Sequence, residues 1–255
     1  MPQRRVSPPH VGHDRAGRAM VRGLGTPRLD EPNTPVVLVP GPGAPGCLLR
    51  TPERLAQSGP VRLLGVPGSG DPSGPACPET LGPLADTVAR WLATVPPGPV
   101  VLAGHSTGAR VALHAAVRVP GRVRALVLPA PPTFPPHLRR LRPLLGALTR
   151  TAARDDPGVV PALSPSYLKA GPRRLPNCIR SARADSPEEV LPAVTCPVTV
   201  VAGEDDALCP PDRTDHLARR ARSGRAVRAP GAPAFPRPHP AVTADLLLLA
   251  RGGRS

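Results

Sequence analysis

Short runs of Val, Leu and Ala alternate with amphipathic segments along most of this chain. Gly- and Pro-rich stretches bound each run, a pattern typical of short buried strands. The strands expected on this basis are 36–39, 61–66, 99–103, 123–128, 197–206 and 225–229. The helices expected between them are 51–59, 79–95, the segment after 108, the segment from about 212, and 240–251. This alternation indicates a mostly parallel sheet with helices on both faces.

Two segments depart from the alternation. Residues 1–20 are basic, polar and interrupted by Pro, which predicts a flexible N-terminal arm. Residues from about 131 to 192 are rich in Pro and Arg and contain helix-like sequence, which predicts an inserted helical lid. The remaining sequence within 21–255 is long enough for one α/β domain with a substantial core.

Charge and aromatic content argue against a nucleic-acid partner. The chain has 33 basic and 18 acidic residues, a net charge of +15. The arginines are scattered, Lys169 is the one lysine, and only 2% of residues are aromatic. Nucleic-acid surfaces usually gather basic residues and interleave them with aromatic rings. We therefore expect a small-molecule substrate, and the sequence indicates no oligomeric state.

Cysteine and hydropathy patterns bear on cofactors and location. The five cysteines form no C-x-x-C pair, and the histidines show no metal-ligand spacing, so no metal or other cofactor is expected. The first 20 residues contain no apolar segment of the secretory type. The longest aliphatic run, 246–250, is too short to span a bilayer. These features predict a cytoplasmic protein without a membrane partner.

The pentapeptide GHSTG at 104–108 carries the strongest chemical signal. It follows the expected strand 99–103 and precedes a helix-like segment. A Gly-x-Ser-x-Gly sequence between strand and helix is typical of a nucleophile elbow, which exposes the serine hydroxyl above the sheet. Ser106 is then the candidate nucleophile. The amide of Thr107 is the candidate oxyanion donor, because it starts the new helix.

With this elbow, the chain resembles the α/β-hydrolase family over about residues 20–250. The loop VPGSGDPSG after the second strand is similar to the family's D-x-P-G-x-G-D-S signature, with Gly65 in place of the Asp. VVAGEDDALCP is similar to the family's strand and G-x-x-D turn. The resemblance implies a catalytic acid at Asp206, with Asp205 as the neighbour that a one-residue shift would select. No cofactor is implied.

The catalytic histidine departs from the family pattern. Aligning PGA at 230–232 places Ala234 where the resemblance expects the histidine. Only His216 and His239 follow Asp206 in the sequence. His216 lies within an expected helix, whereas His239 lies five positions late in the appropriate loop. His239 is therefore assigned as the provisional general base, with a surface residue at the helix entry as the alternative.

The first oxyanion loop also departs from the family. In VLVPGPGAPG, Pro40 takes the histidine position and Pro42 the amide-donor position, although a two-residue shift would place Ala44 there. Proline has no N–H to donate. The leading hypothesis is a serine hydrolase of small esters, thioesters or related acyl substrates. The alternative is a catalytically impaired homologue that binds a small molecule or performs lyase or cyclase-like chemistry.

Overall fold

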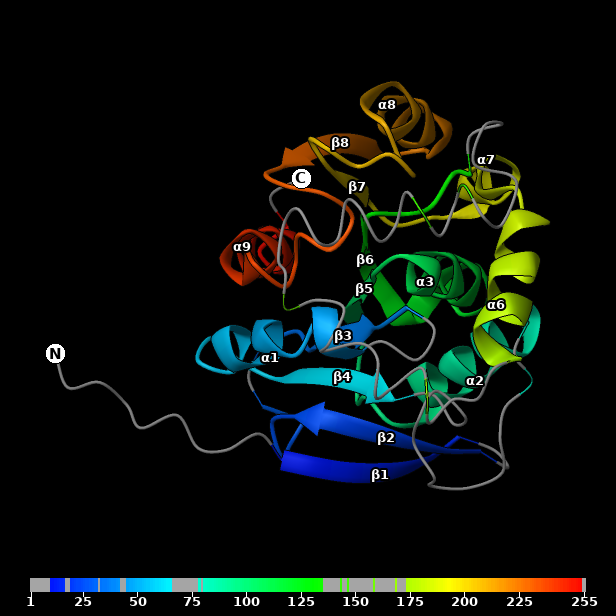
Figure 1. Ribbon diagram of the computed structural model, residues 1–255. Helices are drawn as coiled ribbons and strands as arrows, with labels where there is room; N and C mark the ends of the chain where they lie inside the picture. The colour runs from blue at the N-terminus through cyan, green and yellow to red at the C-terminus, as the bar shows by residue number, and fades with distance from the viewer. Residues whose placement is uncertain are drawn as a thin grey trace, which may run out of the picture.

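The computed structural model describes residues 10–16, 19–31, 33–41, 45–65, 78, 80–134, 143, 146, 158, 168 and 173–253. These residues form an eight-stranded sheet in the order β1-β2-β4-β3-β5-β6-β7-β8 (Figure 1). The strands are β1 (His10–Ala16), β2 (Ala19–Gly25), β3 (Val36–Val39), β4 (Val61–Gly65), β5 (Val100–Gly104), β6 (Val123–Pro129), β7 (Val198–Gly203) and β8 (Gly224–Ala229). Five of the six expected strands lie within one residue of their expected bounds, and the sixth, expected at 197–206, stops at Gly203.

Strands β3 to β8 are parallel, whereas β1 and β2 pair antiparallel and join the sheet beside β4. The expected flexible arm over residues 1–20 is therefore wrong for residues 10–16, which form β1; residues 1–9 lie outside the described residues. The inward positions of β1 are Gly12, Asp14 and Ala16, so no apolar alternation marked the strand. Asp14 is accommodated because Trp91 Nε1 donates to its carboxylate at 3.1 Å.

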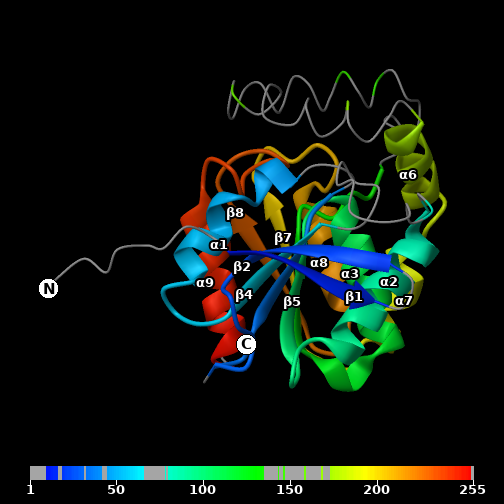
Figure 2. The ribbon, with the colours of Figure 1, turned by 90° about the horizontal axis from the view of Figure 1, so that it is seen from below.

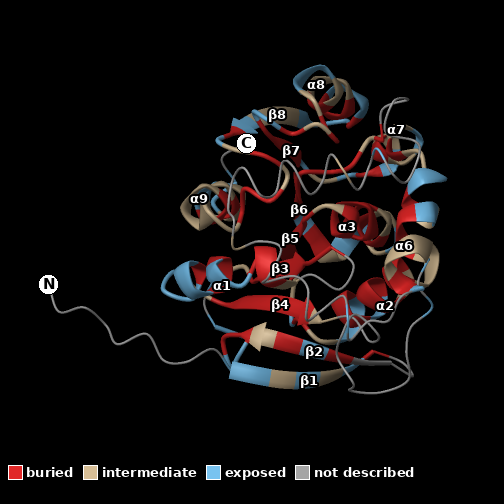
Figure 3. Ribbon diagram, viewed as in Figure 1, coloured by how far each residue is buried: buried red, intermediate tan, exposed pale blue. Residues whose placement is uncertain are grey.

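Helices cover both faces of the sheet (Figure 2). One face carries α2 (Leu81–Thr94), α3 (Thr107–Arg118) and α8 (Pro211–Arg220), and the other carries α1 (Arg50–Leu55) and α9 (Pro240–Arg251). Alternate strand residues enter the two cores: Val37 and Val39 pack on the α3 side, and Val36 and Leu38 on the α9 side. Figure 3 shows the resulting buried centre and the exposed outer strand β1. The predicted α/β-hydrolase architecture is thus confirmed.

The predicted lid at 131–192 lies largely outside the described residues, which resume at 173. Its described C-terminal part is helical, with α6 (Arg174–Arg183), α7 (Pro187–Val190) and a 3-10 turn η4 (Leu191–Ala193). Further 3-10 turns are η1 (Pro45–Cys47) and η2 (Pro120–Arg122). Because β3 and β5 to β8 are parallel, the loops that follow them meet at one edge of the sheet. That carboxyl edge is where ligands bind in open α/β sheets.

Candidate active site

Ser106 occupies a strained turn between β5 and α3. Its backbone has φ 56° and ψ −128°, a combination that non-glycine residues rarely adopt. Its N–H donates to the carbonyl of Pro129 at the end of β6, at 3.0 Å. Strain of this kind persists only where the surroundings enforce it, and it gathers at functional sites. A strained turn between strand and helix is what a nucleophile elbow requires, and we refer to the turn at Ser106 as the elbow.

Close backbone packing at the two glycines enforces this turn. A Cβ added to Gly104 would lie 2.2 Å from the carbonyl oxygen of Gly108. A Cβ added to Gly108 would lie 2.4 Å from the carbonyl oxygens of Val39 and Pro40. Any larger residue at either position would displace the backbone. The glycines of the pentapeptide are therefore required by the contacts between β5, α3 and β3.

The amide of Thr107 is placed as an oxyanion donor would be. Thr107 is the first residue of α3, so its N–H has no acceptor within the helix. The next two amides, of Gly108 and Ala109, donate to the carbonyls of His105 and Ser106, whereas none of the described residues accepts from Thr107 N–H. Gly41 lies beside the turn, because a Cβ added there would be 3.4 Å from Ser106 Cβ. Pro42, the expected defective donor, lies outside the described residues.

Asp206 is buried at the turn after β7, with an exposed fraction of 2%. Its Oδ1 accepts hydrogen bonds from the amides of Leu208 at 2.8 Å and Cys209 at 3.0 Å. Two amide donors fix the position of the carboxylate. Its neighbour Asp205 is exposed. Burial and anchoring thus distinguish the two aspartates, and they favour Asp206 as the group that orients a histidine.

The loop after β8 lies directly against the elbow. His105 Nε2 is 2.8 Å from the carbonyl oxygen of Pro233 and, because a carbonyl only accepts, it is the donor. Burial lowers the pKa of the His105 imidazole, although this hydrogen bond opposes the shift. The ring is therefore neutral near pH 7. The sequence analysis did not find this link between the two loops, because no local pattern encodes a contact between residues 128 positions apart.

Ala234 follows Pro233 and is buried, with an exposed fraction of 8%. The residue at the expected histidine position therefore lies in the loop that contacts the elbow. It carries a methyl group, which transfers no proton.

His239 is the N-cap residue that precedes α9, and its N–H donates to the carbonyl of Phe235 at 2.8 Å. Within the described part of the chain, its ring makes no hydrogen bond to Ser106 or Asp206. His216 lies within α8, as expected for a helix residue. Ser106 and Asp206 thus follow β5 and β7, the parallel strands on either side of β6, and among the described residues no hydrogen bond joins the His239 ring to either of them.

The described residues contain no group of three or more His, Cys, Asp or Glu side chains that could hold a metal ion. Burial raises the pKa of the Cys209 thiol to about 12 and that of Cys196 to about 11. These thiols are therefore poor nucleophiles near neutral pH. No helix among the described residues is both long and apolar enough to cross a bilayer.

Comparisons with known proteins identify the family of this chain. Residues 36–246 match the model of the alpha/beta hydrolase family. A pimeloyl-[acyl-carrier protein] methyl ester esterase of Neisseria meningitidis serogroup A / serotype 4A is 29% identical over 198 residues, 68% of this chain and 62% of that protein. The chain belongs to the alpha/beta hydrolase family.

Solved structures show the same fold. A serine hydrolase involved in carbazole degradation superposes with a TM-score of 0.77 at 19% identity, covering 96% of this chain and 100% of that one. A Bacillus subtilis carboxylesterase superposes with a TM-score of 0.71 at 14% identity, covering 96% and 92%. At these identities the likeness concerns the architecture alone.

Proposed function

We propose that this chain is a serine hydrolase that cleaves a small ester, thioester or related acyl substrate. The observation that carries the proposal is the strained backbone of Ser106, enforced by close packing at Gly104 and Gly108. The esterase activity in the name of the Neisseria relative supports the same reaction class.

In the proposed reaction, Ser106 Oγ attacks the acyl carbonyl and passes its proton to the general base. The Thr107 amide stabilises the oxyanion that forms on the carbonyl oxygen. The base then protonates the departing alcohol or thiol, and water hydrolyses the acyl-enzyme by the same route. Asp206 orients the base and stabilises its cationic form.

His239 is the proposed base. It directly precedes α9, which follows β8, so it belongs to the same edge of the sheet as Ser106. Catalytic hydrogen bonds are often long in a protein without substrate and shorten when substrate binds. The proposal therefore requires the loop after β8 to bring His239 toward Ser106 in the complex.

Labelling with a fluorophosphonate tests the nucleophile, because the probe reacts with an activated serine whatever the substrate. We expect labelling of the parent and none of Ser106→Ala. Ser223→Ala, in an exposed turn, is the matched control and should label like the parent. A folded parent that does not react at neutral pH would contradict the hydrolase assignment.

A second candidate function is binding, or lyase or cyclase-like chemistry, without hydrolysis. Two observations favour it: Ala234 occupies the expected histidine position, and His239 has no hydrogen bond to Ser106 within the described residues. A protein that binds small molecules but neither reacts with the probe nor cleaves activated esters would support this candidate.

We also propose a cytoplasmic location. Cys196 and Cys209 are free thiols, as is usual in a reducing compartment. Microscopy of the tagged full-length protein checks this, and a signal confined to the cell envelope would contradict it.

A further inference from the structure

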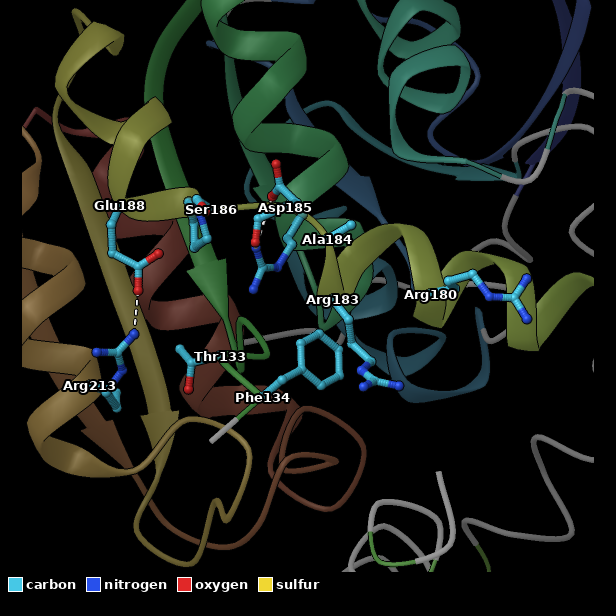
Figure 4. A pocket seen from close by; sticks show the side chains of 11 residues that line it. Thr133, Phe134, Arg180, Arg183, Ala184, Asp185, Ser186, Glu188 and Arg213 are labelled. Carbon is cyan, nitrogen blue, oxygen red and sulfur yellow. Dashed lines mark hydrogen bonds and ion pairs between the residues drawn. The ribbon is translucent and has the colours of Figure 1, made fainter. Parts of the chain in front are cut away.

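A cavity of about 630 Å³ opens between α3, α6, α7 and α8 (Figure 4). Thr133 forms part of its wall, and its N–H and hydroxyl donate to the carbonyl of Leu208 at 2.9 and 2.6 Å. The amide of Leu208 donates in turn to Asp206. The cavity wall is thus linked through Leu208 to the candidate catalytic acid, and the volume is within the range of small-molecule sites, about 300–1,000 Å³.

Each of the two carboxylates that line the cavity forms an ion pair with an arginine. Asp185 accepts from Arg110 Nη1 at 2.8 Å and lies 2.7 Å from His114 Nε2. Burial alone would raise the pKa of Asp185, but the hydrogen bonds to His114 and Arg110 outweigh it and lower the pKa. Glu188 pairs with Arg213 (Figure 4). Neither carboxylate therefore repels an incoming anion as an isolated charge would.

Two further arginines give the lining a positive surplus. Arg180 and Arg183 lie on α6 and both are exposed. Arg180 donates to the neutral amide oxygen of Asn177 at 3.0 Å, and Arg183 has no ion-pair partner among the described residues. Their guanidinium groups have N–H donors that no carboxylate among the described residues engages, and such forks match the oxygens of carboxylate and phosphate.

An apolar wall adjoins these charges. Phe134 lines the cavity, and the Arg110 guanidinium lies 5.8 Å from its ring centroid. The backbone of Phe134 has φ 46°, and that of Ala130 has φ 49°. Two strained residues therefore bracket the segment that forms this wall. Backbone strain of this kind gathers at ligand clamps as well as at active sites.

We propose that this cavity binds a small amphiphilic anion, with an apolar body against Phe134 and a carboxylate or phosphate group held by Arg183 and Arg180. We assign Arg110 no direct contact with the anion, because its N–H donors are already engaged by the carbonyl of Pro132 and by Asp185. Binding requires no reaction at Ser106. The site is therefore independent of the proposed hydrolysis.

Calorimetry on Ser106→Ala protein tests the site with hexanoate, hexyl phosphate and the neutral 1-hexanol. The serine substitution prevents turnover and leaves the lining unchanged. We expect at least one anion to bind about ten-fold more tightly than 1-hexanol. The tighter of the two anions identifies the preferred head group. Affinity should fall as salt is added, because the two arginines are exposed.

Arg183→Gln, added to the same background, should weaken anion binding about five- to ten-fold and leave 1-hexanol unaffected. Arg219→Gln removes an exposed charge from α8 outside the cavity, so it should bind the anions like the parent. Thermal melts check that both variants are folded. Equal binding of anions and 1-hexanol, or loss of affinity in both arginine variants alike, would overturn the proposal. Because labelling of Ser106 is measured separately, failure of this site and failure of the hydrolase assignment are distinguishable.

Discussion

The loops after β5 and β8 touch at the carboxyl edge of the sheet, yet they are built differently. The elbow after β5 is held by backbone contacts, with Gly104 and Gly108 too close to their neighbours to admit a Cβ. The loop after β8 is a series of turns at 233–238, and the hydrogen bond from His105 to Pro233 joins it to the elbow.

The difference shows which parts of a catalytic site a fold can enforce. The geometry of the elbow depends on main-chain packing at Gly104 and Gly108, so it forms when the chain adopts this fold. The base depends on the identity of one side chain, and Ala234 fits its buried position without disturbing the surrounding turns. The turn at Ser106 can therefore be preserved by main-chain packing whether or not a histidine stands at position 234.

The largest effect is expected at the catalytic acid. Asp206→Asn should lower kcat for an activated ester about 10⁴-fold, because a neutral amide neither orients nor stabilises a cationic histidine. Asp205→Asn, at the exposed neighbouring position, is the matched control and should retain activity. Steady-state kinetics on both variants measures this. A greater loss in Asp205→Asn would reverse the assignment of the two aspartates.

Two histidine substitutions test the loop after β8. If His239 is the base, His239→Ala should lower turnover about 10²–10⁴-fold, the usual contribution of general-base catalysis. Ala234→His should then add little. If the base position is vacant, His239→Ala should have no effect and Ala234→His should raise turnover, by at most the same factor.

Rates of ester cleavage at neutral pH distinguish the two outcomes, with His216→Ala on α8 as the control. Clear esterase activity that survives His239→Ala, without any gain from Ala234→His, would show that another group is the base.

A smaller effect is expected from disrupting the elbow packing. Gly104→Ala should lower the free energy of unfolding by about 3 kcal/mol, because the added Cβ would collide with the carbonyl of Gly108. Gly121→Ala is the matched control, since nothing beyond its chain neighbours lies within 4 Å of a Cβ at this exposed position in η2. It should leave the free energy of unfolding close to that of the parent. Urea unfolding measures both, and equal stabilities would contradict the packing argument.

The smallest effect concerns the hydrogen bond between the two loops. Because burial lowers the pKa of His105 in the folded protein, the unfolded chain takes up a proton first as the pH falls through about 6.5. The contribution of the neutral His105 ring to the free energy of unfolding should be complete above that pH. It should decline as the pH falls toward the lower pKa of His105 in the folded protein. His105→Gln should therefore reduce the loss of unfolding free energy between about pH 7.5 and pH 5.5.

His216→Gln removes a histidine from α8 outside this hydrogen bond and serves as the control. It should retain the pH dependence of the parent. Urea unfolding at the two pH values measures all three proteins, and an unchanged dependence in His105→Gln would show that the buried ring does not contribute.

Much of the sheet and the elbow could be predicted from the sequence, because they depend on local patterns. Buried strands are recognisable in the sequence as apolar runs. The pentapeptide GHSTG, between a strand and a helix, predicts the turn at Ser106. Strand β1 could not be predicted, because its inward positions are Gly12, Asp14 and Ala16. Asp14 is accommodated by residues far away in the sequence, since Trp91 donates to it and Arg62 interacts with its charge.

The sequence by itself determined the fold, the nucleophile candidate and the absence of a histidine at position 234. The tertiary structure decided how the parts meet: Asp206 is anchored by two amides, His105 joins the elbow to the loop after β8, and Arg180 and Arg183 line one cavity with Phe134. These relations depend on chain folding that brings distant segments together. Local spacing encodes which residues share an element, whereas contacts between elements arise only when the sheet and its helices are packed.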